Sequence, residues 1–128
     1  MNTAKLAGLR VMVVEDEALV AMLTCDTLED LGCQVLGPFA TAEKALVCLQ
    51  SNPVDVAVLD VNLGDGQTSG PVASALAATS TPFLFTTGYG SSSMLGEFPL
   101  APIVTKPFTE TQLERALKGL IPTKKSAA

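Results

Sequence analysis

The stretch Val54-Asp55-Val56-Ala57-Val58-Leu59-Asp60-Val61-Asn62 is a short apolar run, rich in β-branched residues, that leads into an acidic side chain. A continuous apolar run of this length is typical of a parallel strand that helices bury on both faces. We therefore predict a central strand that ends at Asp60. Open α/β sheets bind ligands at the carboxyl ends of their strands, which makes Asp60 the first candidate functional residue.

The rest of the chain alternates strand and helix patterns around this run. Further strands are predicted at 9–14, 33–37, 82–87 and 103–105. Helices are predicted at about 17–31, 41–50, 71–78 and 109–120. Between 91 and 102, serines, glycine and prolines favour only one short, weak helical turn followed by loop. Strand and helix thus alternate five times, which predicts a parallel sheet covered on both faces.

Individual residues predict the helix ends and faces. Thr41 and Thr109 are placed to cap two helices, and Gly32 to end the first helix. The inward face of the first helix is predicted to hold Leu19, Met22, Leu23 and Leu31. The inward face of the last helix is predicted to hold Leu113, Ala116, Leu117 and Leu120. The pair Gly37-Pro38 is expected to close the second strand.

Composition limits the class of protein. A chain of 128 residues indicates one domain, with a core over about 9–120 and flexible ends at 1–8 and 121–128. Hydrophobic residues make up 48% and charged residues 16%, which excludes general disorder. The net charge of −5 argues against nucleic acid or an anionic membrane as partner. No stretch approaches the roughly 20 apolar residues of a membrane span, so we expect a cytoplasmic protein.

Two residue types exclude further classes. The three cysteines lack Cys-x-x-Cys spacing, so we expect reduced core residues rather than a disulfide framework or a zinc site. Histidine is absent, which excludes a Ser-His-Asp or Cys-His catalytic arrangement.

Four of the predicted strands end in polar side chains. Glu15 and Asp16 follow the first strand, Asp60 ends the third, Thr87 the fourth and Lys106 the fifth. Each alone has an ordinary explanation, such as a helix start, a turn residue or a surface charge. Because parallel strands place their carboxyl ends at one edge, the ordered set is far more specific. We expect these side chains to converge.

Three converging carboxylates need a positive partner, because their repulsion would otherwise drive one of them to protonate. The divalent cation Mg²⁺ fits best, since all the candidate ligands are oxygens. With the ammonium of Lys106 and the hydroxyl of Thr87, the cluster would suit a phosphoryl group.

The motifs at the strand ends resemble those of the receiver domains of two-component response regulators. They are Val-Val-Glu-Asp-Glu (13–17), Val-Leu-Asp-Val-Asn-Leu (58–63), Thr-Thr-Gly-Tyr (86–89) and Thr-Lys-Pro-Phe (105–108). The resemblance covers the chain from Val11 to about Leu120. It implies a flavodoxin-like (βα)5 three-layer α/β sandwich with strand order 2-1-3-4-5. It also implies Mg²⁺ as cofactor, a sensor histidine kinase as phosphodonor, and a downstream protein that the sequence does not name.

The resemblance also implies a role for each site residue. Asp60 would accept the phosphoryl group as nucleophile. The implied Mg²⁺ ligands are Asp16, Asp60 and the backbone carbonyl of Asn62, with Glu15 acting mostly through water. Thr87 and Lys106 would hold the phosphoryl oxygens.

The chain departs from the commonest receivers in three places. The loop after Asp60 is longer and glycine-rich, with Gly64 where many receivers have proline. Ile103 stands where the family usually has a switch aromatic. The segment 85–89 resembles a subfamily, often of stand-alone receivers, with a Phe-Ala-Thr-Gly motif. Tyr89 is the candidate switch residue, the alternative being a loop tyrosine without that role, and we hypothesise that 90–102 is the mobile element.

These features predict a single-domain response regulator. It would signal by phosphorylation-dependent conformational change, through partner binding or phosphate relay. We expect no enzymatic activity beyond self-phosphorylation and slow autodephosphorylation. The alternative is a pseudo-receiver, a protein-interaction module that is never phosphorylated. A metal-dependent phosphatase would need a second aspartate two residues after Asp60, where Asn62 stands.

Overall fold

The structure is a computed structural model and describes residues 6–88 and 93–121. It contains five strands: β1 (Arg10–Val14), β2 (Gln34–Phe39), β3 (Val56–Asp60), β4 (Phe83–Thr87) and β5 (Ile103–Thr105). It contains four α-helices: α1 (Ala18–Asp30), α2 (Ala42–Ser51), α3 (Gly70–Ala78) and α4 (Glu110–Leu120). One 3₁₀ helix, η1 (Ser93–Glu97), lies between β4 and β5.

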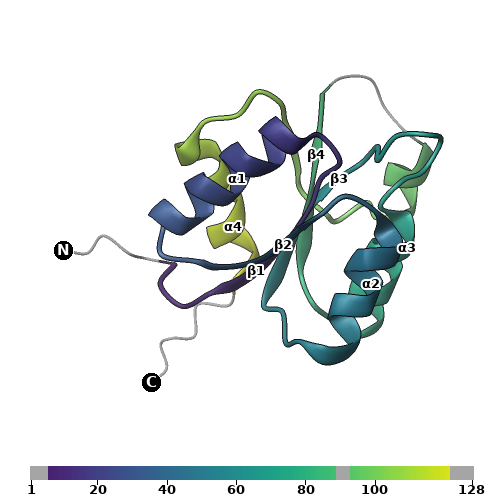
Figure 1. Cartoon of the computed structure of the whole chain (residues 1–128), viewed down its shortest axis with the longest axis horizontal. Helices are drawn as coiled ribbons and strands as arrows, with labels where there is room; N and C mark the ends of the chain where they lie inside the picture. The colour runs from purple at the N-terminus through teal and green to yellow at the C-terminus, as the bar shows by residue number, and fades with distance from the viewer. Residues whose placement is uncertain (1–5, 89–92, 122–128) are drawn as a thin grey trace.

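The strands form one parallel sheet in the order β2-β1-β3-β4-β5, which confirms the predicted flavodoxin-like topology. Helices α1 and α4 cover one face, and α2 and α3 cover the other (Figure 1). Among the described residues, none of the helices combines the length and apolar character needed to cross a membrane.

The central strand β3 is apolar up to Asp60 because helices bury both of its faces. All five of its residues are buried. Ala57 and Leu59 pack with α2 and α3, whereas Val56 and Val58 pack with α1 and α4. Each face of the sheet therefore has its own core, and a polar residue in mid-strand would be buried on either side.

Two predicted helix caps are confirmed. The Thr41 hydroxyl accepts a hydrogen bond from the backbone N–H of Lys44 at the start of α2. Thr109 and Gln112 form a reciprocal capping box at the start of α4. Such caps satisfy backbone N–H groups that have no partner within the helix, so the ends of these helices are encoded locally.

The predicted inward face of α1 is wrong in three of its four residues. Leu19, Met22 and Leu23 are 65%, 54% and 57% exposed, and only Leu31, which follows the helix, is buried. The residues of α1 that are buried are Ala21, Thr24 and Leu28. These also recur at helical spacing, and the two smaller side chains let the helix lie close to the sheet. The large apolar residues consequently form an exposed patch, which we call the α1 patch (Leu19, Met22 and Leu23).

The boundaries of β2 and of the core also differ from prediction. Strand β2 continues through Gly37-Pro38 to Phe39, with a register irregularity opposite Met12 and Val14. Proline is tolerated because β2 is an edge strand. The core begins before residue 9, since Leu6 is buried against the α1 and α4 side.

Among the described residues between β4 and β5, 88 and 93–102, no α-helix forms, and one short helical turn precedes loop, as predicted. This turn is the 3₁₀ helix η1, and Met94 within it is buried. Phe98 follows η1 and packs edge-on against Phe83, with ring centroids 5.6 Å apart. Aromatic packing thus holds the segment around Phe98, which has low helix propensity, against the sheet.

The corrected face of α1 makes a testable prediction. Leu28→Ala should lower the free energy of unfolding by about 3 kcal/mol, because it empties a fully buried position. Leu23→Ala should change it by about 0.5 kcal/mol or less, because that side chain is exposed. Urea denaturation followed by circular dichroism measures both. Equal losses would contradict the observed orientation of the helix.

Candidate metal centre at the carboxyl edge of the sheet

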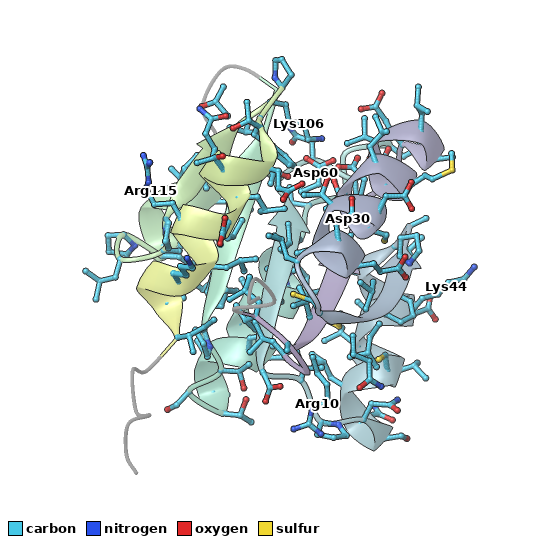
Figure 2. The ribbon with its side chains drawn as sticks, turned by 90° about the vertical axis from the view of Figure 1, so that its left-hand side faces the viewer. Arg10, Asp30, Lys44, Asp60, Lys106 and Arg115 are labelled. Carbon is cyan, nitrogen blue, oxygen red and sulfur yellow. The ribbon has the colours of Figure 1, made fainter. Side chains whose placement is uncertain are left out.

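The predicted site residues meet at one edge of the sheet. Figure 2 shows Asp60 and Lys106 close together near one end of the molecule, with Arg10 towards the opposite end. Asp60 is the last residue of β3, and Lys106 directly follows β5. The parallel topology brings them together although 46 positions separate them in the sequence.

The ammonium of Lys106 joins two carboxylates. Its Nζ lies 2.8 Å from Oε1 of Glu15 and 3.3 Å from Oδ1 of Asp60. Both acidic residues are buried. The backbone N–H of Lys106 donates a 2.8 Å hydrogen bond to the carbonyl of Thr87, which aligns the end of β5 with the end of β4. The position of the lysine is therefore set by the sheet as well as by its charge.

Asp16 completes a group of three carboxylates. One oxygen each from Glu15, Asp16 and Asp60 lies within 4.8 Å of the others. Asp16 is exposed, so the group opens to solvent on that side. Three carboxylates against one ammonium leave excess negative charge, and hard oxygen donors at this spacing suit Mg²⁺. The residues present therefore fit the predicted ion.

The two aspartates that bracket β3 titrate in opposite directions. Burial, together with the hydrogen bond and negative charge of Glu15, raises the pKa of Asp60 to about 7, although Lys106 opposes the shift. Burial also tends to raise the pKa of Asp55, but its hydrogen bonds and ion pair with Arg10 outweigh this and lower it. The surroundings of Asp60 thus disfavour its charged form, and an added cation would favour it.

The surroundings of Lys106 shift its pKa the other way. Burial alone would lower the pKa of Lys106, but the hydrogen bonds and charges of Glu15 and Asp60 raise it above its usual value. The lysine therefore stays protonated at neutral pH and offers a fixed positive charge.

The loop after β3 forms a small hairpin, residues 61–69, that sequence reasoning missed. Backbone hydrogen bonds run from Leu63 N–H to the Gln67 carbonyl and from Ser69 N–H to the Val61 carbonyl. These bonds flank an antiparallel bridge between Asn62 and Thr68. Asn62 and Thr68 are thus a non-hydrogen-bonded pair, and the ladder does not use the Asn62 carbonyl. That carbonyl stays available as the metal ligand that the family resemblance implies.

The structure tests the other site predictions to different extents. It brings together Glu15, Asp16, Asp60 and Lys106, as expected. Glu15, however, contacts Lys106 directly, a pairing that the sequence analysis did not foresee. Thr87 is buried at the end of β4, beside this cluster in the strand order. Tyr89, the candidate switch residue, lies outside the described residues.

The chain thus combines a doubly wound parallel sheet with a buried, strand-end aspartate, a lysine beside it and a group of carboxylates that could hold a metal ion, the arrangement expected of a receiver domain. The sequence matches the response regulator receiver domain over residues 11–118. The chain belongs to that family.

Similar proteins include stand-alone receiver structures and parts of larger regulators. The solution structure of SdrG from Sphingomonas melonis Fr1 is 38% identical, with a TM-score of 0.77, and the match covers 94% of this chain and 98% of that one. The BeF3-activated conformation of SdrG from Pseudomonas melonis Fr1 is 41% identical, with a TM-score of 0.75, covering 91% of this chain and 98% of that one.

The phyllosphere-induced regulator PhyR of Methylorubrum extorquens is 28% identical over 120 residues, which are 91% of this chain but 45% of PhyR. The chain thus spans less than half the length of the curated relatives it matches.

The raised pKa of Asp60 predicts how stability depends on pH without metal. An aspartate titrates near 3.9 in an unfolded chain, so the folded state holds this proton more tightly. The stability that this proton contributes is complete below about pH 4 and is lost as the pH rises through about 7. Asp60→Asn removes this loss.

In EDTA, Asp60→Asn should therefore raise the melting temperature at pH 8 by about 5 °C, and by less at pH 5. Thermal denaturation at both pH values measures the gain. Asp30→Asn, at the exposed end of α1, is the control and should show no such pH dependence. An equal gain at both pH values would contradict the raised pKa.

Proposed function

We propose that this receiver domain is a phosphorylation-controlled response regulator in which Asp60 accepts a phosphoryl group from the phosphohistidine of a partner kinase. The proposal includes dependence on Mg²⁺, a cytoplasmic location, and signalling through partner binding or phosphate relay. It includes no enzymatic activity beyond self-phosphorylation and slow autodephosphorylation. The observation that carries it is the buried Asp60 carboxylate, 3.3 Å from the Lys106 ammonium and next to two further carboxylates.

The geometry suits in-line transfer to a carboxylate. An Asp60 oxygen forms the new O–P bond while the N–P bond of the phosphohistidine breaks, and the electron pair returns to the imidazole nitrogen. Phosphoryl transfer depends mainly on positioning and neutralisation of charge, which Lys106 supplies in part. A bound Mg²⁺, held by Asp16, Asp60 and the Asn62 carbonyl, would neutralise the remaining oxygens. The missing histidine is no obstacle, because the partner provides it.

The α1 patch is the surface on which we propose that the partner docks. It lies on the helix that follows Asp16, and its Leu23 also borders a groove of about 410 Å³ lined by Lys106, Pro107 and Phe108. The apolar surface therefore reaches the reacting centre. Helix α1 also carries Asp26, Glu29 and Asp30 but no lysine or arginine. A partner surface with apolar side chains flanked by basic ones would fit it.

The readout within the domain remains a prediction. Of the segment 90–102, residues 93–102 are described, and there η1 lies beside the start of α3, since a Cβ placed on Gly70 would be 3.2 Å from Cγ of Met94. We propose that phosphorylation at Asp60 alters this segment. Ile103, exposed on β5, cannot act as the family's usual aromatic switch.

The phosphoacceptor role is tested by incubation with acetyl phosphate and Mg²⁺, followed by intact-protein mass spectrometry. The wild type should gain the mass of one phosphoryl group, and Asp60→Asn should gain none. Asp30→Asn is the matched control and should gain it as the wild type does. No gain in a folded wild-type protein would favour the pseudo-receiver, a binding module that is never phosphorylated.

The docking surface is tested by Leu23→Asp, which places a charge on the α1 patch. Phosphotransfer from a purified histidine kinase that phosphorylates the wild type should slow by about tenfold or more, since central apolar contacts dominate interface energies. Phosphorylation by acetyl phosphate should not change. Val47→Asp on α2, where Val47 is 59% exposed, is the control and should leave both rates unchanged. Equal slowing with acetyl phosphate would point to damage at the site itself.

A further inference from the structure

The tip of the 61–69 hairpin has an unusual backbone. Gly64, Asp65 and Gly66 have φ angles of +84°, +52° and +75°, all in the left-handed region. The N–H of Gln67 donates a 2.8 Å hydrogen bond to the carbonyl of Gly64. Two left-handed central residues closed by such a bond are typical of a type I′ turn, for which Asp-Gly is a favoured pair. Local sequence thus encodes the turn.

This turn lies beside the group of three carboxylates. A Cβ placed on Gly64 would lie 3.1 Å from Oδ2 of Asp16, closer than ordinary van der Waals contact. Gly66, two residues further on, has a similar φ, yet a Cβ there would meet nothing within 4 Å. One glycine therefore borders a metal-ligand candidate, whereas the other serves the turn alone.

The carboxylate of Asp16 is less constrained than those of Glu15 and Asp60. In the described part of the chain, no hydrogen bond or ion pair holds it, in contrast to Glu15 and Asp60, which both contact Lys106. Asp16 is also repelled by these two carboxylates, which lie within 4.8 Å. Because Gly64 has no Cβ, the hairpin leaves the Asp16 carboxylate room in this position, whereas a side chain there would crowd its Oδ2.

We propose that Gly64 is a positioning residue for the metal centre: because it has no Cβ, the hairpin can lie beside Asp16 and leave that carboxylate in the position where it would bind Mg²⁺. The same hairpin leaves the Asn62 carbonyl outside its ladder, so one loop would govern two ligands. The inference rests on the metal dependence in the proposed function. Mg²⁺ demands near-ideal octahedral geometry at short distances, whereas Ca²⁺ accepts looser geometry, so misplacement of Asp16 should weaken Mg²⁺ binding more than Ca²⁺ binding.

The test compares Gly64→Ala with Gly66→Ala. Both variants force a side chain into the left-handed region, and only the first crowds Asp16. Titration of each metal-free protein with MgCl2 and with CaCl2, followed by amide NMR shifts, gives the affinities. Gly64→Ala should lower Mg²⁺ affinity about tenfold and Ca²⁺ affinity less, whereas Gly66→Ala should change both by less than about twofold. Both variants should lose similar thermal stability.

Equal losses of Mg²⁺ affinity in the two variants would overturn the proposal, because the turn and not the contact would then be responsible. Unchanged Mg²⁺ affinity in Gly64→Ala would also overturn it, as would an equal loss for Mg²⁺ and Ca²⁺. The titration contains no phosphodonor, so its result is independent of whether Asp60 is phosphorylated. A wild type that binds Mg²⁺ but is never phosphorylated would contradict the proposed function and leave the role of Gly64 open to the same comparison.

Discussion

The site depends on one unbalanced cluster of charge: the ammonium of Lys106 faces the carboxylates of Glu15 and Asp60, with Asp16 close by. One positive charge cannot neutralise three negative ones, and burial removes the water that would otherwise screen them. The raised pKa of Asp60 is the direct consequence. A site held in this state gains from any added positive charge, which is the physical basis for expecting a divalent cation.

Packing of the sheet opposes the repulsion between these carboxylates. Strands β1, β3 and β4 are almost wholly buried, with separate cores on the two faces, so their carboxyl ends cannot move apart to relieve the repulsion. Close-packed interiors have low compressibility, so the strand ends stay in place despite the repulsion. Helix α1 contributes differently, because Ala21 and Thr24 face the sheet and its larger apolar residues remain at the surface beside the site. One side of α1 thus packs against the sheet, and the other is the surface where we propose that the partner docks.

The sequence patterns were sufficient to predict the strands and the convergence of Glu15, Asp16, Asp60 and Lys106, and the family resemblance supplied the strand order. Continuous apolar runs such as 56–59 identify buried strands, and parallel pairing then brings together the residues that follow them. The patterns were insufficient where two of them competed. On α1, Leu19 and Leu23 recur at helical spacing. Ala21 and Leu28 do so as well, on another face of the helix, and only packing against the sheet selects which set is buried. The Glu15–Lys106 contact likewise depends on distances across the sheet that no local pattern encodes.

The hairpin after β3 was missed for another reason. Its signal, Asp65-Gly66, is present in the sequence, but the hairpin lies within a loop and has only one bridge, at Asn62 and Thr68. The conformation of so short a turn is determined by the left-handed backbone preference of Asp-Gly and not by burial, so hydrophobic periodicity does not predict it. The turn nevertheless lies beside Asp16, which follows a different strand, since a Cβ on Gly64 would be 3.1 Å from its Oδ2. Side chains mounted on rigid strands supply the charge of the centre, and a locally encoded turn borders its one exposed carboxylate.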